Sequence, residues 1–193
     1  MYDFLITYIK NHSTTPITDT EIEAIQAAFV PKKIRKRQYF LQEGQVCKNV
    51  AFIVKGAMRE YYVDDKGVEH ITRLLIENCW AVDRESYVMR NPSVYNIDAW
   101  EDCDVLLLAR DHHLSLLNSI PHYNEAMRRA NDTLAIAMQK RVASFSLSAE
   151  ERYAELIRTQ PEILLRFPQH IIASYLGVAK ETLSRIRGYV GKK

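Results

Sequence analysis

Short runs of hydrophobic residues alternate with turn-forming residues between about residues 30 and 110. Each run has four to nine residues, is rich in Val, Ile, Tyr and Leu, and is bounded by Gly, Asp or Asn. This spacing is typical of an antiparallel sandwich or barrel. The predicted strands read YFLQ, VAFIVK, AMREYYV, VEHITRLLI, VYNIDAW and DVLLLA. We see no helix-length pattern in this region, so we expect an all-β core.

Helical patterns flank the β region. Thr18 and Glu21 have capping-box spacing, and apolar residues continue at helical steps to Phe29, which predicts a short amphipathic helix. Ser148 and Glu151 repeat the capping-box spacing at the start of a helix that ends before Pro161. Between them, a long helix is predicted over residues 121–145.

The long helix carries apolar residues at three- and four-residue steps, which indicates one hydrophobic stripe. We interpret it as a dimerisation helix, although the stripe could also be buried against the chain's own β region. The residues expected near the dimer seam are Met127, Leu134, Met138 and Phe145. The fold class is therefore α+β, with a β-roll domain and N-terminal helix in residues 1–120, a linker and dimerisation helix in 121–147, and a third domain in 148–193.

The third domain contains a pattern typical of a helix-turn-helix, in residues 167–190. Gly177 supplies the turn, since glycine tolerates the positive φ that a tight turn requires. The positions expected to pack the two helices together are Ile172, Ala173, Leu176, Val178, Leu183 and Ile186. The second helix then leaves Lys180, Glu181, Ser184 and Arg185 on its outer face, where such side chains can read base edges or hold phosphates in DNA. The simpler alternative is a helical hairpin with a solvated charged face.

The distribution of charge favours the DNA-binding interpretation. The chain has a formal net charge of +2, whereas residues 161–193 alone carry +4 and the remainder carries −2. Positive charge near the predicted helix-turn-helix is needed to neutralise DNA phosphates. A second basic run lies at Lys32, Lys33, Arg35, Lys36 and Arg37. It is a further candidate site for nucleic acid. We favour the interpretation that these cations lie on the exposed face of an edge strand and protect it from pairing with other chains.

Composition excludes several other classes of protein. A chain of 193 residues with 47% hydrophobic residues can form a real core, and it contains neither an apolar run long enough for a membrane span nor a secretory signal, so we expect a cytoplasmic protein with no membrane partner. Three widely spaced cysteines favour neither disulfides nor a metal site. The histidines lack cupin-type metal spacing, and no nucleotide-loop or hydrolase motif is present, so we expect no metal, no cofactor and no enzyme activity.

The order of β-roll, long helix and helix-turn-helix resembles the Crp/Fnr family of bacterial transcription regulators. The stretch AKETLSRIR is similar to the family's recognition helix, and EGQVCKNVAFIVKGAMREYYVDDKG is similar to its β-roll core. The resemblance implies base contacts by Lys180, Glu181 and Arg185. The residues expected to contact phosphates are Gln169, His170, Thr182, Ser184 and Arg187. It also implies a homodimer on a palindromic double-stranded DNA operator and RNA polymerase as a further partner.

The chain departs from the family in the segment that holds a cyclic nucleotide. Val82 and Asp83 stand at the family's Gly-Glu pair, and Ser93 and Val94 stand at its Arg-Ser pair, so the cationic phosphate clamp is missing. Arg84 or Arg90 could substitute only from a different position. We therefore expect no control by cyclic AMP, and either no effector or an unidentified small molecule. The candidate pocket residues are Val82, Asp83, Arg84, Glu85, Ser86, Ser93 and Val94.

Two further expectations follow. No room exists between Thr159 and Phe167 for the β-hairpin wing that many family members place before the helix-turn-helix. The alternative function is a small-molecule binding module whose helix-turn-helix is vestigial or contacts proteins, and salt-dependent DNA binding would separate the two.

Overall fold

The computed structural model describes residues 1–14 and 16–190, without the side chains of 189 and 190. Two four-stranded antiparallel sheets form a β-roll, with strand orders β1-β8-β3-β6 and β2-β7-β4-β5. The strands are β1 Val30–Ile34, β2 Tyr39–Leu41, β3 Asn49–Lys55, β4 Met58–Val63, β5 Glu69–Leu75, β6 Trp80–Ala81, β7 Asn96–Ala99 and β8 Cys103–Ala109. The antiparallel β fold expected from the alternating pattern is confirmed.

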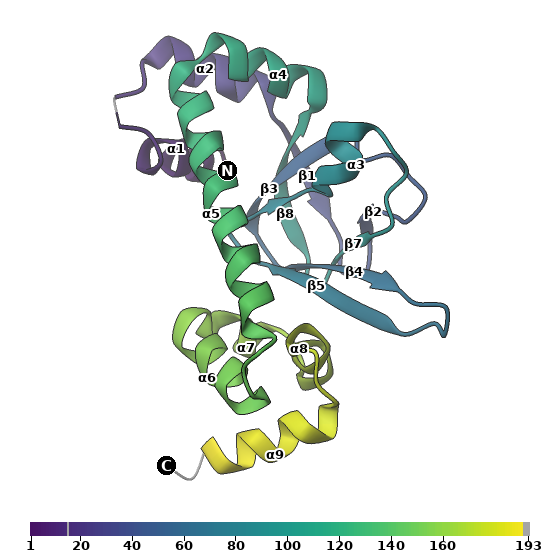
Figure 1. Ribbon diagram of the computed structural model, residues 1–193. Helices are drawn as coiled ribbons and strands as arrows, with labels where there is room; N and C mark the ends of the chain where they lie inside the picture. Colours follow the sequence, from purple (N-terminus) through teal and green to yellow (C-terminus); the bar gives the residue numbers. More distant parts are fainter. Residues whose placement is uncertain (15, 191–193) are drawn as a thin grey trace.

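Helices surround one end of the roll and continue away from it (Figure 1). They are α1 Tyr2–Asn11, α2 Asp19–Ala28, α3 Arg84–Met89, α4 Arg110–Ser119, α5 Pro121–Ser144, α6 Ala149–Thr159, α7 Pro161–Arg166, α8 Gln169–Leu176 and α9 Lys180–Val190. Helix α5 runs from α1, α2 and α4 at one end of the molecule to α6–α9 at the other (Figure 1). It therefore connects the β-roll to the C-terminal helices.

Both expected capping boxes are present. The Thr18 backbone N–H donates to Glu21 at 2.9 Å, and the Ser148 backbone N–H donates to Glu151 at 2.8 Å. In return, the hydroxyl of each capping residue accepts from the backbone N–H three residues later, at 3.3 and 3.2 Å. These bonds fix where α2 and α6 begin, because they satisfy backbone donors that the helix cannot satisfy itself.

The expectation that no helix interrupts the β region is wrong. The six-residue helix α3 lies between β6 and β7. Its N-terminus is capped by Asp83, whose carboxylate accepts from the backbone N–H groups of Glu85 and Ser86 at 3.1 and 3.3 Å. A segment of six residues is too short to show a helical hydrophobic period, so only this cap could have indicated it.

The residues that the structure describes form two hydrophobic cores. The larger one fills the β-roll and includes helices α1, α2 and the first part of α5, with Leu5, Phe52, Ile97 and Tyr123 fully buried. The second core joins the C-terminal helices to strands β4 and β5. In the described part of the chain, no helix is both long enough and apolar enough to cross a membrane.

Candidate nucleic-acid interface and effector pocket

Helices α8 and α9 form the helix-turn-helix unit that the sequence pattern predicts. Gly177 ends α8 with φ 68° and ψ 37°, and the backbone N–H of Val178 donates to the carbonyl of Ala173 at 3.0 Å. The left-handed conformation explains the glycine, because a side chain there would be strained even where space is open. The buried side chains between the helices are Ile172, Ala173, Leu176, Leu183 and Ile186. Burial of this stripe leaves the opposite face of α9 in solvent.

The proposed base-reading residues share that solvent-facing side of α9. Lys180, Glu181 and Arg185 are exposed. They form no ion pair with the other residues that the structure describes, and the Arg185 guanidinium donates to the Thr182 hydroxyl at 3.5 Å. Charged side chains that are not held in ion pairs can form new hydrogen bonds with a ligand at little cost.

The proposed phosphate-contacting residues border the same surface. Ser184, Arg187 and His170 are exposed, whereas Thr182 and Gln169 are half-buried. The Gln169 amide donates to the carbonyl of Lys180 at 3.3 Å, which links the start of α8 to the start of α9. The structure thus brings both predicted sets together, and Lys192 and Lys193, counted in the local charge, lie outside the described residues.

The helix-turn-helix unit packs against the β-roll of its own chain. Ser174 of α8 donates to the carbonyl of Glu69 at 3.1 Å and accepts from the N–H of Ile71 at 3.0 Å. These bonds cover the outer side of β5, which is an edge strand of its sheet. Arg141 of α5 adds hydrogen bonds to the carbonyls of Ile71 and Tyr175, at 3.2 and 3.0 Å.

An ion-pair cluster strengthens the same contact. Arg166, the last residue of α7, pairs with Glu77 at 2.5 Å and with Glu101. Glu77 also accepts from the Gly56 backbone N–H at 2.7 Å. Hydrogen bonding to Arg166 lowers the pKa of Glu77 against the opposing effect of its burial. The C-terminal unit is therefore held to the roll by charge as well as by apolar packing.

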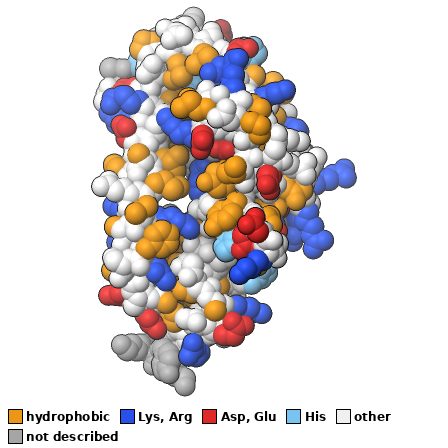
Figure 2. All heavy atoms as spheres, turned by 45° about the vertical axis from the view of Figure 1, so that its right-hand side comes forward, with side chains coloured by type: hydrophobic (Ala, Val, Ile, Leu, Met, Phe, Trp, Pro, Cys, Tyr) orange, Lys and Arg blue, Asp and Glu red, His pale blue; other side chains and the backbone are white. Residues whose placement is uncertain are grey.

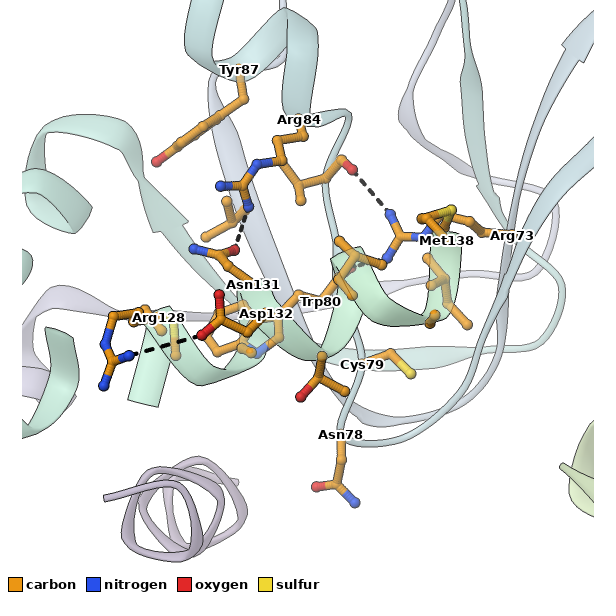
Figure 3. A pocket seen from close by; sticks show the side chains of 18 of the residues that line it. Arg73, Asn78, Cys79, Trp80, Arg84, Tyr87, Arg128, Asn131, Asp132 and Met138 are labelled. Atoms are coloured by element: carbon orange, nitrogen blue, oxygen red, sulfur yellow. Dashed lines mark hydrogen bonds and ion pairs between the residues drawn. The ribbon is translucent and has the colours of Figure 1, made fainter. Parts of the chain in front are cut away.

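A cavity of about 760 Å³ lies between α5 and the β-roll. Its lining is largely apolar and includes Leu75, Val82 and Leu134. Trp80 of the roll and Met138 of α5 also line it (Figure 3). Gln160 and Tyr175 of the C-terminal unit also line it. The β-roll, helix α5 and the C-terminal unit thus all contribute to the cavity lining. A ligand bound there would contact all three parts of the chain.

The candidate pocket residues do not all face this cavity. Val82 and Arg84 line it, and the Arg84 guanidinium donates to Asn131 of α5 across the cavity (Figure 3). Asp83 is buried as the cap of α3, and Glu85 and Val94 are exposed outside the lining.

The two serines are engaged elsewhere. The Ser86 hydroxyl accepts from the Cys47 backbone N–H at 2.9 Å and donates to the Asn91 carbonyl at 2.6 Å. The Ser93 hydroxyl donates to the Tyr95 carbonyl and accepts from its backbone N–H, both at 3.0 Å. Both groups are therefore structural rather than available to a ligand.

The sequence interpretation missed Arg73, one of the charged residues that line the cavity. Arg73 of β5 pairs with the buried Glu60 at 3.2 Å and donates to the carbonyls of Val82 and Trp80, at 3.2 and 2.9 Å. Desolvation by burial raises the pKa of Glu60, with Arg73 acting in the opposite direction. An arginine next to the apolar residues Leu74 and Leu75 of β5 was the signal, since a buried cation requires a partner.

A half-buried histidine, His113, also lines the cavity. The Tyr87 hydroxyl and the Nδ1 atom of His113 share a hydrogen bond of 2.9 Å. Desolvation lowers the pKa of His113 to about 4, and the Arg84 charge acts in the same direction. His113 is therefore neutral at physiological pH.

The expected dimer-seam residues differ in exposure. Met127 is only 5% exposed, in the core of its own β-roll. Leu134 and Met138 line the cavity, whereas Phe145 is 59% exposed. Val142 is 68% exposed on the same stretch of α5. The sequence left open that the apolar stripe of α5 is buried against the chain's own roll. This applies to the first part of the stripe, at Met127, and not to its end, at Phe145.

Comparison with known proteins identifies the roll. Residues 31–119 match the model of the cyclic nucleotide-binding domain family. Solved structures extend the similarity to the C-terminal helices. FixK2 from Bradyrhizobium japonicum superposes with a TM-score of 0.74, at 17% identity, over 85% of this chain and 85% of that one. The chain has the Crp/Fnr fold.

Two other structures support this assignment. The catabolite activator protein of Thermus thermophilus has a TM-score of 0.56 and 18% identity, over 91% of this chain and 84% of that one. A protein of Eubacterium rectale assigned to the crp/fnr family of transcriptional regulators has a TM-score of 0.66 and 16% identity, over 90% and 83%. No curated protein sequence matches the chain. The predicted resemblance to Crp/Fnr proteins is therefore confirmed in domain family and fold.

Proposed function

We propose that this Crp/Fnr-type chain is a dimeric, sequence-specific DNA-binding transcription regulator that cyclic AMP does not control. The observation that carries the proposal is the exposed face of α9, where Lys180, Glu181 and Arg185 form no ion pair with the other described residues while Leu183 and Ile186 are buried. Arg or Lys reads guanine and Glu accepts from cytosine in the major groove. The fold places this helix as the second of a helix-turn-helix, which is the helix that enters the groove.

Dimerisation is part of the proposal because one helix-turn-helix covers too little DNA for useful specificity. The end of α5 offers an apolar surface for it, since Val142 and Phe145 are exposed. A two-fold dimer would match a palindromic site with half-sites about 34 Å apart. RNA polymerase remains the expected further partner of such a regulator.

Independence from cyclic AMP rests on the pocket. Val82 carries a β-branched side chain where the family has glycine, the Asp83 carboxylate occupies the amides of α3, and Arg73 is neutralised by Glu60. A cyclic phosphate would therefore meet neither the free amides nor the Arg-Ser clamp of the family, and Arg84, which lines the cavity, donates to Asn131 from a different position. The effector, if the cavity binds one, is expected to be a different small molecule that suits its apolar lining.

One experiment tests DNA binding and another tests the effector. Selection of duplexes from a random pool, followed by gel shift at several salt concentrations, should yield one palindromic consensus with strongly salt-dependent affinity. Isothermal titration calorimetry with cyclic AMP and cyclic GMP should show no binding. A dissociation constant below about 10 μM with tightened DNA binding would overturn the second part of the proposal.

A second candidate function is a small-molecule binding protein whose helix-turn-helix contacts proteins. The docking of Ser174 on strand β5 favours it, because the unit is already engaged in a protein contact. Absence of any selected duplex would favour this candidate over DNA binding.

A further inference from the structure

A second cavity lies on the outer face of the sheet β2-β7-β4-β5. Met58 and Ile97 of this sheet point into the larger hydrophobic core, so Arg59 and Asp98, one position along each strand, face away from it. The cavity has a volume of about 390 Å³, which is sufficient for a small molecule. We call it the outer-sheet pocket, and the residues that define it are Lys36, Arg37, Tyr39, Arg59, Tyr61 and Trp100.

Arg59 is held in one position inside the outer-sheet pocket. Its guanidinium donates to both carboxylate oxygens of Asp98, at 2.9 and 3.0 Å, and to Glu69 at 2.5 Å. The guanidinium carbon lies 4.3 Å from the centre of the Tyr61 ring and 5.5 Å from that of the Trp100 ring. Asp98 and Glu69 are the two carboxylates of the lining, and both already have Arg59 as their cationic partner. The pocket therefore offers no free acid to a cationic ligand.

Two cations of the pocket have no such partner. Lys36 and Arg37 follow the end of β1, are exposed, and form no ion pair with the residues that the structure describes. The Lys36 backbone N–H donates to Asp102 at 2.8 Å and that of Arg37 donates to the Ala99 carbonyl at 2.7 Å, so their backbones are fixed. The lining has three cations and two carboxylates, a net charge of 3 − 2 = +1, which favours an anionic ligand. Figure 2 shows that lysine and arginine side chains are not confined to the C-terminal end of the face drawn there.

Aromatic rings form the walls of the outer-sheet pocket. Tyr39 is 43% exposed, and its hydroxyl lies 3.3 Å from that of Tyr61. This hydrogen bond uses one of the two phenol protons, and burial raises the pKa of Tyr61, so the other proton can be donated to a ligand. The Trp100 ring lies 5.9 Å from the Lys36 ammonium and 6.0 Å from the Phe167 ring. The rings are thus held in place beside the free cations.

We propose that the outer-sheet pocket binds a small aromatic carboxylic acid, with its ring against Tyr39 and Trp100 and its carboxylate against Lys36 and Arg37. Flat aromatic surface beside free cations matches a ligand that joins a ring to an anionic group. An inorganic anion would leave the rings uncovered, and a neutral ring would leave the cations without a partner. The pocket shares no lining residue with the cavity between α5 and the roll, and the inference does not depend on DNA binding.

A fluorescence titration of the full chain tests the proposal. Trp80 and Trp100 are the only tryptophans, so the variant Trp80→Phe leaves Trp100 as the sole reporter. The probe is para-nitrobenzoate, whose nitroaromatic ring quenches indole fluorescence on contact, and para-nitrobenzamide is its uncharged counterpart. We expect saturable quenching by the acid with a dissociation constant on the order of 0.1–1 mM, as for a ligand of about a dozen non-hydrogen atoms. The amide should bind about tenfold more weakly.

Three variants in the same background locate the site. Lys36→Gln with Arg37→Asn should weaken the acid about tenfold without changing the amide, and asparagine is chosen because it tolerates the φ of 68° at Arg37. Tyr39→Ala should weaken both probes about threefold to tenfold, because it removes a stacking surface. The matched control is Lys32→Gln with Lys33→Gln, which removes the same charge from the edge strand β1 and should leave both affinities unchanged.

Circular dichroism checks that each variant is folded. Calorimetry of the wild type with the same two probes replaces the fluorescence readout if Trp80→Phe does not fold, and the single variant Lys36→Gln replaces the double variant in the same case. Equal affinity for acid and amide would overturn the inference, as would equal losses in the test and control double variants or quenching of Trp100 that does not saturate. None of these results bears on the proposed function, because the titration contains no DNA.

Discussion

Arg185 is the residue that best distinguishes base reading from phosphate binding. Replacing Arg185 by Ala should cost about 1–3 kcal/mol on the selected duplex and relax preference at one base pair, because a bidentate contact to guanine carries discrimination of that size. Competition binding with cognate and random duplexes measures both. Arg187→Ala is the control, since a phosphate contact should weaken both duplexes alike. Equal losses on both duplexes for Arg185→Ala would assign it to phosphate.

His113 makes the stability of the β-roll depend on pH. Its pKa is lowered to about 4 by burial, so the folded protein binds fewer protons than the unfolded chain between pH 4 and about 6.5. Its contribution is fully present above pH 6.5 and is lost as the pH falls, by up to about 3 kcal/mol. Urea unfolding at pH 7 and pH 5 should show a larger drop for the wild type than for His113→Gln. Identical drops would mean that His113 titrates normally.

Residues at surfaces were easier to predict than residues inside the roll. The helical period alone placed Lys180, Glu181 and Arg185 on the exposed side of α9, because burial of Leu183 and Ile186 fixes the opposite side. The role of Asp83 as a helix cap and the pairing of Arg73 with Glu60 depend on contacts between segments. A strand pattern specifies which side a residue faces but not which buried charge it meets.

Helix α5 is the element that connects the β-roll to the C-terminal helices, and its second half should form the dimer interface. Val142→Glu should separate the protomers, because Val142 lies on the same side of the helix as Met138 and is 68% exposed. Ile136→Glu is the matched control, since Ile136 is 53% exposed on a different side. Size-exclusion chromatography with light scattering measures the mass. A wild type that is monomeric at micromolar concentration and still binds its duplex tightly would contradict the dimer.

Elements with a long period or a cap signal were predicted, whereas the ten-residue helices α1 and α4 and the short elements β6 and α3 were not. The capping boxes located α2 and α6, and the 24-residue helix α5 has a clear stripe. The two-residue strand β6 and the six-residue helix α3 contain too few positions to show any period. Their conformations are set by pairing with β3 and by the Asp83 cap.

Across the whole molecule, Arg166 should stabilise the contact between the C-terminal unit and the roll. Arg166→Gln leaves Glu77 and Glu101, about one third exposed, without their partner. We expect a loss of about 1–3 kcal/mol in urea unfolding. Arg158→Gln is the control, because its pair with Glu155 is exposed to solvent and should contribute much less to stability. Similar losses for both variants would show that the cluster does not hold the two units together.

The sequence predicted the order of parts in the molecule but not how they dock. Arg166 meets glutamates 65 and 89 positions away in the chain, and nothing local marks those partners. Likewise, the docking of α8 on β5 depends on backbone groups of an edge strand, which every strand possesses. Contacts of this kind arise from the folded arrangement rather than from any residue pattern.

The Asp83 cap has a consequence for how this molecule responds to its surroundings. The carboxylate is tethered to the amides it binds, so its effective concentration there is at least millimolar. A free anion at micromolar concentration would have to displace the Asp83 carboxylate, which is covalently attached to the chain and cannot diffuse away. The Asp83 carboxylate thus acts as an intramolecular ligand of the N-terminus of α3. We expect changes in the concentration of cellular phosphate metabolites to leave this helix end unchanged.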